Sequence, residues 1–260
     1  MRWMLLIGAA LLLNVVTAIA AESPCVVVEG GIVRGPQTQK KIALEFTADE
    51  FVEGGPTILN ELKARHLKAS FFLTGRCARR PENKLLIRRM IDEGHYVGPH
   101  SNSHPLLCPW TGTKRTLVTK QFFLDDLKQN ISSLEHAGVG RNRIKFFLPP
   151  YEWYNAEVAE WTREAGLTII NHTSGTRSAA DYTEEKAHNF VSSQAIFDSI
   201  VQQEKRDGLN GYLLLMHLGA GPGRNDKMHR RIGELLDELQ KRGYQFVTVD
   251  ELLRDCRSGA

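Results

Sequence analysis

The sequence has no excess of charge of either sign. Its 33 Lys and Arg residues nearly balance its 30 Asp and Glu residues, which leaves a formal net charge of +3 over 260 residues. A charge this small gives no sign of a surface for nucleic acid or acidic lipid. Basic pairs such as Arg88–Arg89 are expected to be solvated faces of helices. We therefore expect no nucleic-acid partner.

Several sequence motifs of common enzyme classes are also missing. The chain contains no G-x-G-x-x-G, no Walker motif and no G-x-S-x-G, which disfavours nucleotide binding and serine-hydrolase chemistry. It has no internal repeats and no low-complexity segments. With 42% hydrophobic and 24% charged residues, the composition is that of an ordinary globular protein. We expect one catalytic domain over residues 21–260.

The one long hydrophobic run that stands apart is at the N-terminus. Arg2 precedes an apolar stretch that ends at Ala18-Ile19-Ala20, a pattern typical of a secretory signal peptide cut before Ala21. An uncleaved membrane anchor is the alternative, although the stretch is short for a span of ~20 residues. We expect residues 1–20 to be a signal peptide. The mature protein is then secreted or periplasmic and makes no membrane contact.

Cysteine is scarce, with only Cys25, Cys77, Cys108 and Cys256. Outside the cytoplasm these residues could form disulfides, and the sequence does not choose among the three full pairings. Cys25 and Cys256 flank the domain and could join its termini. Cys77 and Cys108 each follow an apolar, strand-like segment and could meet at one rim of a sheet. Free buried thiols are the alternative, and the spacings do not resemble a zinc site.

The chain does have a regular alternation of apolar strands and amphipathic helices. Segments 41–47, 69–73 and 212–216 are continuous strand-like runs, and helix-like patterns lie between the strands about seven times. Such alternation predicts an α/β fold of right-handed βαβ units, with a parallel sheet covered on both faces. A barrel of about seven parallel strands is the expected closure, and an open doubly wound sheet is the alternative.

Polar side chains follow directly after several of these strands. They are Asp49, Glu50, His100, His104, Tyr151 and His217. In a parallel β/α barrel the carboxyl ends of the strands share one face, where active sites lie. Two imidazoles and a carboxylate are a known hydrolytic metal set that leaves room for water. We therefore expect Asp49, His100 and His104 to bind one divalent metal ion.

The segment Gly94–Pro105 carries a family resemblance. Its His100-Ser101-Asn102-Ser103-His104 run resembles the H-[S/T]-x-x-H metal motif of the polysaccharide deacetylase family (NodB homology, carbohydrate esterase family four). Segments 69–75, 215–217 and 243–248 resemble other motifs of this family, so the resemblance extends from about residue 41 to 253. It implies a distorted, NodB-like β/α barrel that removes N- or O-acetyl groups from a polysaccharide or oligosaccharide.

The resemblance also implies roles for single residues. His100 and His104 would be metal ligands, His217 the general acid, and the backbone N–H of Tyr151 an oxyanion donor. The metal would be Zn²⁺, with Co²⁺, Ni²⁺ or Mn²⁺ as alternatives. Aromatic residues of the loops, Trp110 among them, could stack on sugar rings or simply pack at the rim.

The chain departs from the family in its first and third motifs. The family has Thr-Phe-Asp-Asp where this chain has Glu45–Glu50, E-F-T-A-D-E. Without a gap, Thr47 and Ala48 take the two acid positions. A shift of one residue places Asp49 on the metal-ligand position and leaves Glu50 as the adjacent carboxylate that could act as base.

In the third motif Leu148 stands where the family has an arginine, and Asp181 with the following tyrosine could replace the family's Asp-Trp partner at the substrate side. These changes fit a variant deacetylase. They equally fit a non-catalytic carbohydrate-binding relative, and a hydrolase of another C–N amide bond is a third reading.

Overall fold

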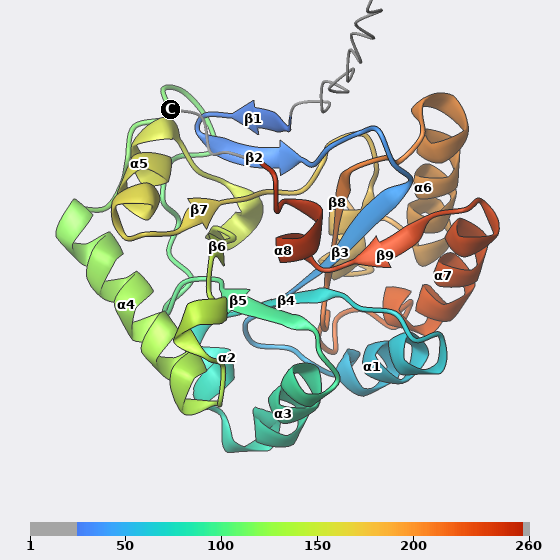
Figure 1. Cartoon of the computed structure of the whole chain (residues 1–260), viewed down its shortest axis with the longest axis horizontal. Helices are drawn as coiled ribbons and strands as arrows, with labels where there is room; N and C mark the ends of the chain where they lie inside the picture. Colours follow the sequence, from blue (N-terminus) through green and yellow to red (C-terminus); the bar gives the residue numbers. More distant parts are fainter. Residues whose placement is uncertain (1–24, 257–260) are drawn as a thin grey trace, which may run out of the picture.

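Strand β3 (Lys41–Ala48) is the centre of the fold in the computed structural model, which describes residues 25–256. It pairs in parallel with β8 (Tyr212–His217) on one side and with β4 (Ser70–Leu73) and β9 (Gln245–Val247) on the other. Strand β5 (Tyr96–Pro99) pairs with β4, also in parallel. Figure 1 shows this sheet in the middle of the molecule. The predicted signal peptide, residues 1–20, lies outside the described residues.

A second, two-stranded parallel sheet consists of β6 (Phe146–Phe147) and β7 (Thr168–Ile169). Single backbone hydrogen bonds link it and the loop after it to the main sheet. The amide of Leu148 donates to the carbonyl of Pro99 (3.2 Å), and the amide of Thr173 donates to the carbonyl of Leu213 (2.9 Å). The expected α/β fold with a parallel central sheet is thus confirmed, with its described parallel strands divided between two sheets.

Residues of β3 alternate between two apolar layers, as the pleat of a strand requires. Ile42, Leu44 and Phe46 pack outward against the helices. Ala43 packs inward against residues of β4, β8 and β9. By the same alternation Glu45 and Thr47 face inward, and both are buried. The polar side chains of Glu45 and Thr47 therefore lie on the same face of β3 as the inner apolar layer.

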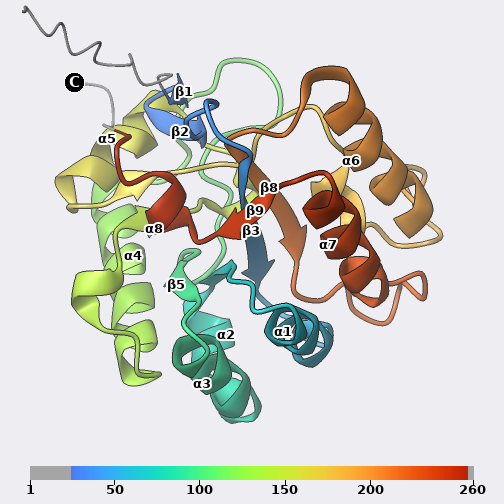
Figure 2. The ribbon, with the colours of Figure 1, turned by 45° about the vertical axis from the view of Figure 1, so that its right-hand side comes forward.

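Helices surround the strands, as Figures 1 and 2 show. The longer ones are α1 (Gly55–Ala64), α3 (Lys84–Asp92), α4 (Lys120–His136), α5 (Ala156–Glu164), α6 (Ser193–Asp207) and α7 (Ile232–Lys241). Each presents an apolar stripe to the sheet, as amphipathic helices do. In α7 the stripe is Ile232, Leu235, Leu236 and Leu239. No helix of the described residues is long and apolar enough to span a bilayer.

Short elements complete the described chain. They are α2 (Gly75–Arg79), η1 (Pro81–Asn83), η2 (Arg141–Arg143), η3 (Pro150–Glu152), η4 (Ser178–Tyr182), η5 (Met228–Arg231) and α8 (Val249–Leu252). The amide at the start of α8, that of Val249, donates to the hydroxyl of Ser70 at the start of β4 (2.9 Å). The amino ends of the strands are therefore covered by α8, and the carboxyl ends stay available for a site.

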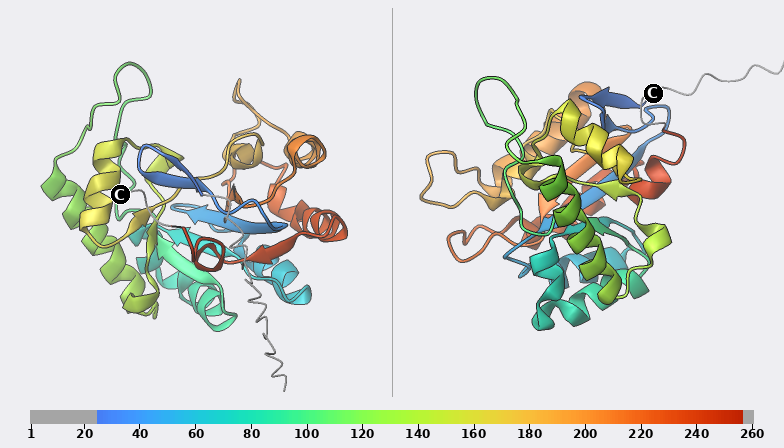
Figure 3. Two further views of the ribbon diagram at one scale, coloured as in Figure 1. Left: turned by 45° about the horizontal axis from the view of Figure 1, so that its top comes forward. Right: turned by 90° about the vertical axis from the view of Figure 1, so that its left-hand side faces the viewer.

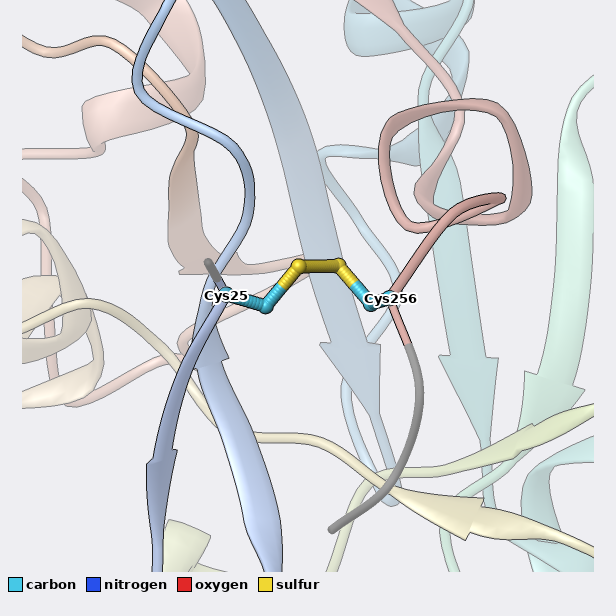
Figure 4. Close-up of a disulfide and its surroundings, with 2 residues drawn as sticks. All are labelled: Cys25 and Cys256. Carbon is cyan, nitrogen blue, oxygen red and sulfur yellow. A yellow bond between two sulfur atoms is a disulfide. The ribbon is translucent and has the colours of Figure 1, made fainter. Parts of the chain in front are cut away.

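Strands β1 (Val26–Val28) and β2 (Gly31–Arg34) pair antiparallel and form an N-terminal hairpin. A disulfide joins Cys25, just before β1, to Cys256 near the end of the described chain (Figure 4). Of the possibilities that the sequence left open, a second disulfide between Cys77 and Cys108 is wrong, because both are free and buried. Cys77 lies in α2, where its sulfur accepts a hydrogen bond from Asn83 (3.4 Å), whereas Cys108 lies in the loop before α4.

Candidate active site

The predicted site residues gather at the carboxyl ends of the strands, around a cavity of about 740 Å³. Those that line it are Asp49, Glu50, His100, His104, Trp110, Tyr151 and His217. Asp181 is not in the lining and lies behind His217, which it contacts. The placement of polar residues after parallel strands thus brings four strand ends, those of β3, β5, β6 and β8, to one cavity.

His100 and His104 form the imidazole half of the site. Their ring centroids are 5.1 Å apart. Nδ1 of His100 donates to the carbonyl of Leu148 (2.8 Å), which leaves Nε2 free to bind a ligand. Burial lowers the pKa of His100 well below its usual range, and His104 lowers it further. Burial also lowers the pKa of His104, so both rings are neutral near pH 7, as metal ligands must be.

Small polar residues shape the turn between these histidines. The hydroxyl of Ser101 accepts a hydrogen bond from the amide of His104 (2.9 Å). Asp126 on α4 accepts the amides of Asn102 (2.7 Å) and Ser103 (3.0 Å). Ser101 and His104 have positive φ values of 67° and 56°, which these hydrogen bonds hold in place. The H-S-N-S-H run is therefore a turn fixed by its own hydroxyl and by one helix carboxylate.

Asp49, the expected third metal ligand, is occupied by other partners. Its Oδ1 accepts from the Thr74 hydroxyl (2.8 Å) and from Nε of Arg76 (3.1 Å), and Arg76 also pairs with Oδ2. In the part of the chain that the structure describes, no three His, Cys, Asp or Glu side chains are gathered closely enough to hold a metal ion. The imidazoles fit a divalent cation, but the Asp49 carboxylate could bind it only after its ion pair with Arg76 is broken. The metal-binding role of Asp49 stays a prediction.

Glu50, the expected base, lies at the rim of the cavity and is exposed. Its backbone carbonyl accepts a hydrogen bond from the Arg80 guanidinium (2.5 Å). The structure gives its carboxyl group no contact with the histidines. Its role as base also stays a prediction.

His217 and Asp181 form a hydrogen-bonded pair. Nδ1 of His217 lies 2.7 Å from Oδ1 of Asp181, and the amide of His217 donates to Oδ2 (2.9 Å). Burial lowers the pKa of His217, but the charge and hydrogen bond of Asp181 outweigh it, and the pKa is raised overall. A histidine with a raised pKa and a free Nε2 is suited to donate a proton.

Two carboxyl groups that the sequence analysis did not single out lie beside this pair. Glu152 lines the cavity, and burial raises its pKa to about 7, with a lowering contribution from His217 and a raising one from Asp181. Glu45 on β3 is entirely buried and neither of its carboxyl oxygens has a hydrogen-bond partner. Burial and then Glu152 raise the pKa of Glu45 well above its usual range. An acidic residue in an otherwise apolar strand was the signal available for Glu45.

Aromatic rings form one wall of the cavity. The Tyr151 ring centroid lies 4.4 Å from that of His104 and 5.4 Å from that of Trp110, and Trp110 lies 6.0 Å from Trp153. Trp110 is 55% exposed and belongs to the loop between β5 and α4, which projects from the body of the molecule in Figure 3. A neighbouring cavity of about 670 Å³ shares Tyr151, Glu152 and Tyr182 as lining. The two cavities are adjacent, and aromatic side chains lie at their boundary.

Comparison with known proteins gives consistent matches. The family model described as "Polysaccharide deacetylase" matches residues 34–170. The peptidoglycan-N-acetylglucosamine deacetylase PgdA of Listeria monocytogenes is 31% identical over 221 residues, which are 83% of this chain but only 39% of that protein. This chain therefore spans about two fifths of the length of that relative.

Solved structures show the same fold. BA3943 of Bacillus anthracis, described as a CE4 family pseudoenzyme, matches with a TM-score of 0.67 and 22% identity, over 89% of this chain and 71% of the other. A family 4 acetyl xylan esterase of Clostridium thermocellum, solved with a cobalt ion, matches with a TM-score of 0.62 and 22% identity, over 84% and 94%.

Proposed function

This chain belongs to the polysaccharide deacetylase family, and we propose that it removes acetyl groups from an acetylated polysaccharide or oligosaccharide. The observation that carries the proposal is the cavity lined by the neutral His100–His104 pair, by aromatic rings and by His217, which Asp181 holds from behind. These are the parts that hydrolysis of an acetyl amide or ester needs: a proton donor, neutral ligands and a surface for a sugar ring. The name of the listerial relative supports an N-acetylated glycan as substrate.

The residues of this chain divide the work as follows. Asp181 fixes the His217 ring and keeps it protonated, so that the ring can give a proton to the departing amine or alkoxide. The backbone N–H of Tyr151 would stabilise the oxyanion. Trp110 and Tyr151 would stack on sugar rings at the rim.

We propose that His100, His104 and Asp49 would hold a divalent cation, Zn²⁺ in the first place and Co²⁺, Ni²⁺ or Mn²⁺ as alternatives. When bound, such an ion polarises the acetyl carbonyl and acidifies water. The two neutral imidazoles and the cobalt ion of the clostridial neighbour support this assignment. The ion pair of Asp49 with Arg76 opposes it, so we expect binding weaker than a free carboxylate would give.

We also propose that the protein acts outside the cytoplasm, after removal of residues 1–20. The Cys25–Cys256 disulfide supports this location, because disulfides persist in oxidising compartments and are rare in the cytosol.

A second candidate function is binding of acetylated carbohydrate without turnover. The absence of a carboxylate at Thr47 and Ala48, and the engagement of Asp49 by Arg76, favour it. The likeness to BA3943, described as a pseudoenzyme, agrees with it.

Acetate release separates the two candidates. The wild-type protein, supplied with Zn²⁺ or Co²⁺, is incubated with N-acetylglucosamine oligomers and with acetylated xylo-oligosaccharides, and free acetate is measured. We expect release by the wild type, and a loss of 10²- to 10⁴-fold, roughly the contribution of a general acid, in His217→Ala. His136→Ala, an exposed histidine on α4, is the matched control. Binding of the oligomers without acetate from the wild type would establish the second candidate instead.

A further inference from the structure

The cavity contains one acidic side chain that is neither at the rim nor paired with a base. Of the described residues, the carboxylates in the lining are Asp49, Glu50, Glu152 and Glu184. Asp49 is bound by Arg76, and Glu50 and Glu184 are exposed. Glu152 is only partly exposed, and it lines both adjacent cavities. It is therefore the carboxylate best placed to meet a molecule that occupies the cavity.

The end of β3 offers no alternative to Glu152. Thr47 is the last inward-facing residue of β3 in the cavity lining, and it lies opposite His217 in the pairing of β3 with β8. Its hydroxyl is buried and has no hydrogen-bond partner, and a hydroxyl is not a base near neutral pH. The next inward residue, Glu45, is entirely buried below the cavity. Neither inward-facing residue at the end of β3 is therefore a suitable proton acceptor.

The backbone around Glu152 is held in an unusual conformation. Tyr151 and Glu152 have consecutive positive φ values, 59° and 55°, in a region that non-glycine residues rarely adopt. The turn is closed by the amide of Glu152, which donates to the carbonyl of Pro149 (3.0 Å). It is also tied down by the side-chain amide of Asn171, which donates to the carbonyl of Glu152 (2.7 Å). Strain of this kind is found preferentially at functional sites.

The charged and titratable groups that face Glu152 come from three elements. They are His217 at the end of β8, Asp181 in η4 and Glu45 in β3. Glu152 and the proton donor His217 line the same cavity. The Glu152 pKa of about 7, a result of burial above all, leaves a substantial fraction ionised near neutral pH, as a general base requires.

We propose that Glu152 is the general base of acetyl release, a role that depends on the deacetylase function proposed above. The Glu152 carboxylate accepts a proton from water while the water oxygen bonds to the acetyl carbon. His217 then gives its proton to the nitrogen or oxygen that leaves as the C–N or C–O bond breaks. The products are acetic acid and a free amine or hydroxyl. Glu152 returns its proton to solvent, and His217 regains one.

The test compares three glutamine variants under conditions in which the wild type releases acetate. Glu152→Gln is expected to lower kcat by at least ~100-fold, as loss of a general base does, with little change in KM. Glu50→Gln tests the rival base, and Glu82→Gln, an exposed residue of η1, controls for loss of a surface charge. Melting temperatures verify folding. A larger loss in Glu50→Gln than in Glu152→Gln would overturn the proposal.

The pH profile separates a base from a merely structural residue. In the wild type, kcat/KM should rise through about pH 7, the pKa of Glu152. This acid limb should vanish in Glu152→Gln, persist in Glu152→Asp, and added formate should restore activity to Glu152→Ala. An acid limb that survives in Glu152→Gln, or an absence of formate rescue, would contradict the role of Glu152. A wild type that releases no acetate would overturn the proposed function and this role together.

Discussion

Each of three residues at this site is oriented or engaged by one neighbouring residue. His100 is oriented by the Leu148 carbonyl, Asp49 is engaged by Arg76, and His217 is held by Asp181. In each case the partner comes from a segment distant in sequence. The protonation state of the site therefore depends on pairs rather than on residue types.

The Asp181–His217 pair makes a prediction about alkaline pH. Asp181→Asn removes the charge that raises the pKa of His217 against burial, so that pKa should fall. Because His217 must be protonated to act as acid, activity is lost as pH rises through its pKa. The alkaline limb of kcat/KM should therefore move to lower pH, and kcat should fall. Asp198→Asn, an exposed residue of α6, is the control. An alkaline limb that does not move would mean that His217 does not supply the proton.

Residue types and spacing were enough to predict that His100, His104 and His217 meet Asp49 and Glu50 at one cavity. They did not predict that Asp49 pairs with Arg76. His100, His104 and His217 were located because each follows an apolar strand. The resemblance places Asp181 on the substrate side, but it lies in a 3-10 turn, pairs with His217 and does not line the cavity. The sequence gives no signal for Glu152, because it follows Pro-Pro-Tyr, where local sequence does not indicate a left-handed turn.

At the scale of elements, the position of α2 beside the end of β3 determines which groups bind the Asp49 carboxylate. Strand β4 pairs with the carboxyl end of β3, so that Leu73 lies opposite Ala48. Helix α2 begins directly after β4. This arrangement brings Thr74 and Arg76 to the Asp49 carboxylate. Since the sequence alone could not fix how E-F-T-A-D-E ends the strand, it could not foresee this competition.

Removal of Arg76 should therefore strengthen binding of a divalent cation. Arg76→Ala frees the Asp49 carboxylate to face His104, and we expect the affinity for Zn²⁺ or Co²⁺ to rise by about tenfold, which corresponds to ~1.4 kcal/mol. Titration calorimetry on metal-stripped protein measures the change. Arg88→Ala, which breaks an exposed ion pair on α3, is the control. Unchanged or weaker binding in Arg76→Ala would show that Asp49 is not a ligand.

For the whole molecule, the disulfide is the covalent link between the two ends of the described chain. Cys25 precedes β1 and Cys256 follows α8, with 231 residues of separation. The site lies at the carboxyl ends of the strands, whereas α8 packs at their amino ends. The bond therefore restrains the fold at the end away from the candidate site.

Loss of this bond should change stability and leave chemistry intact. A bridge that closes so long a loop restricts the unfolded chain strongly, and removal of a native disulfide costs about 2–5 kcal/mol. The double variant Cys25→Ser/Cys256→Ser should lose unfolding free energy of this size in urea titrations, with kcat unchanged well below its melting temperature. A reducing agent should bring the wild type to the level of the variant and leave the variant unaffected, because Cys77 and Cys108 are free thiols. A wild type whose unfolding midpoint does not respond to reductant would show that the ends of the chain are held by packing alone.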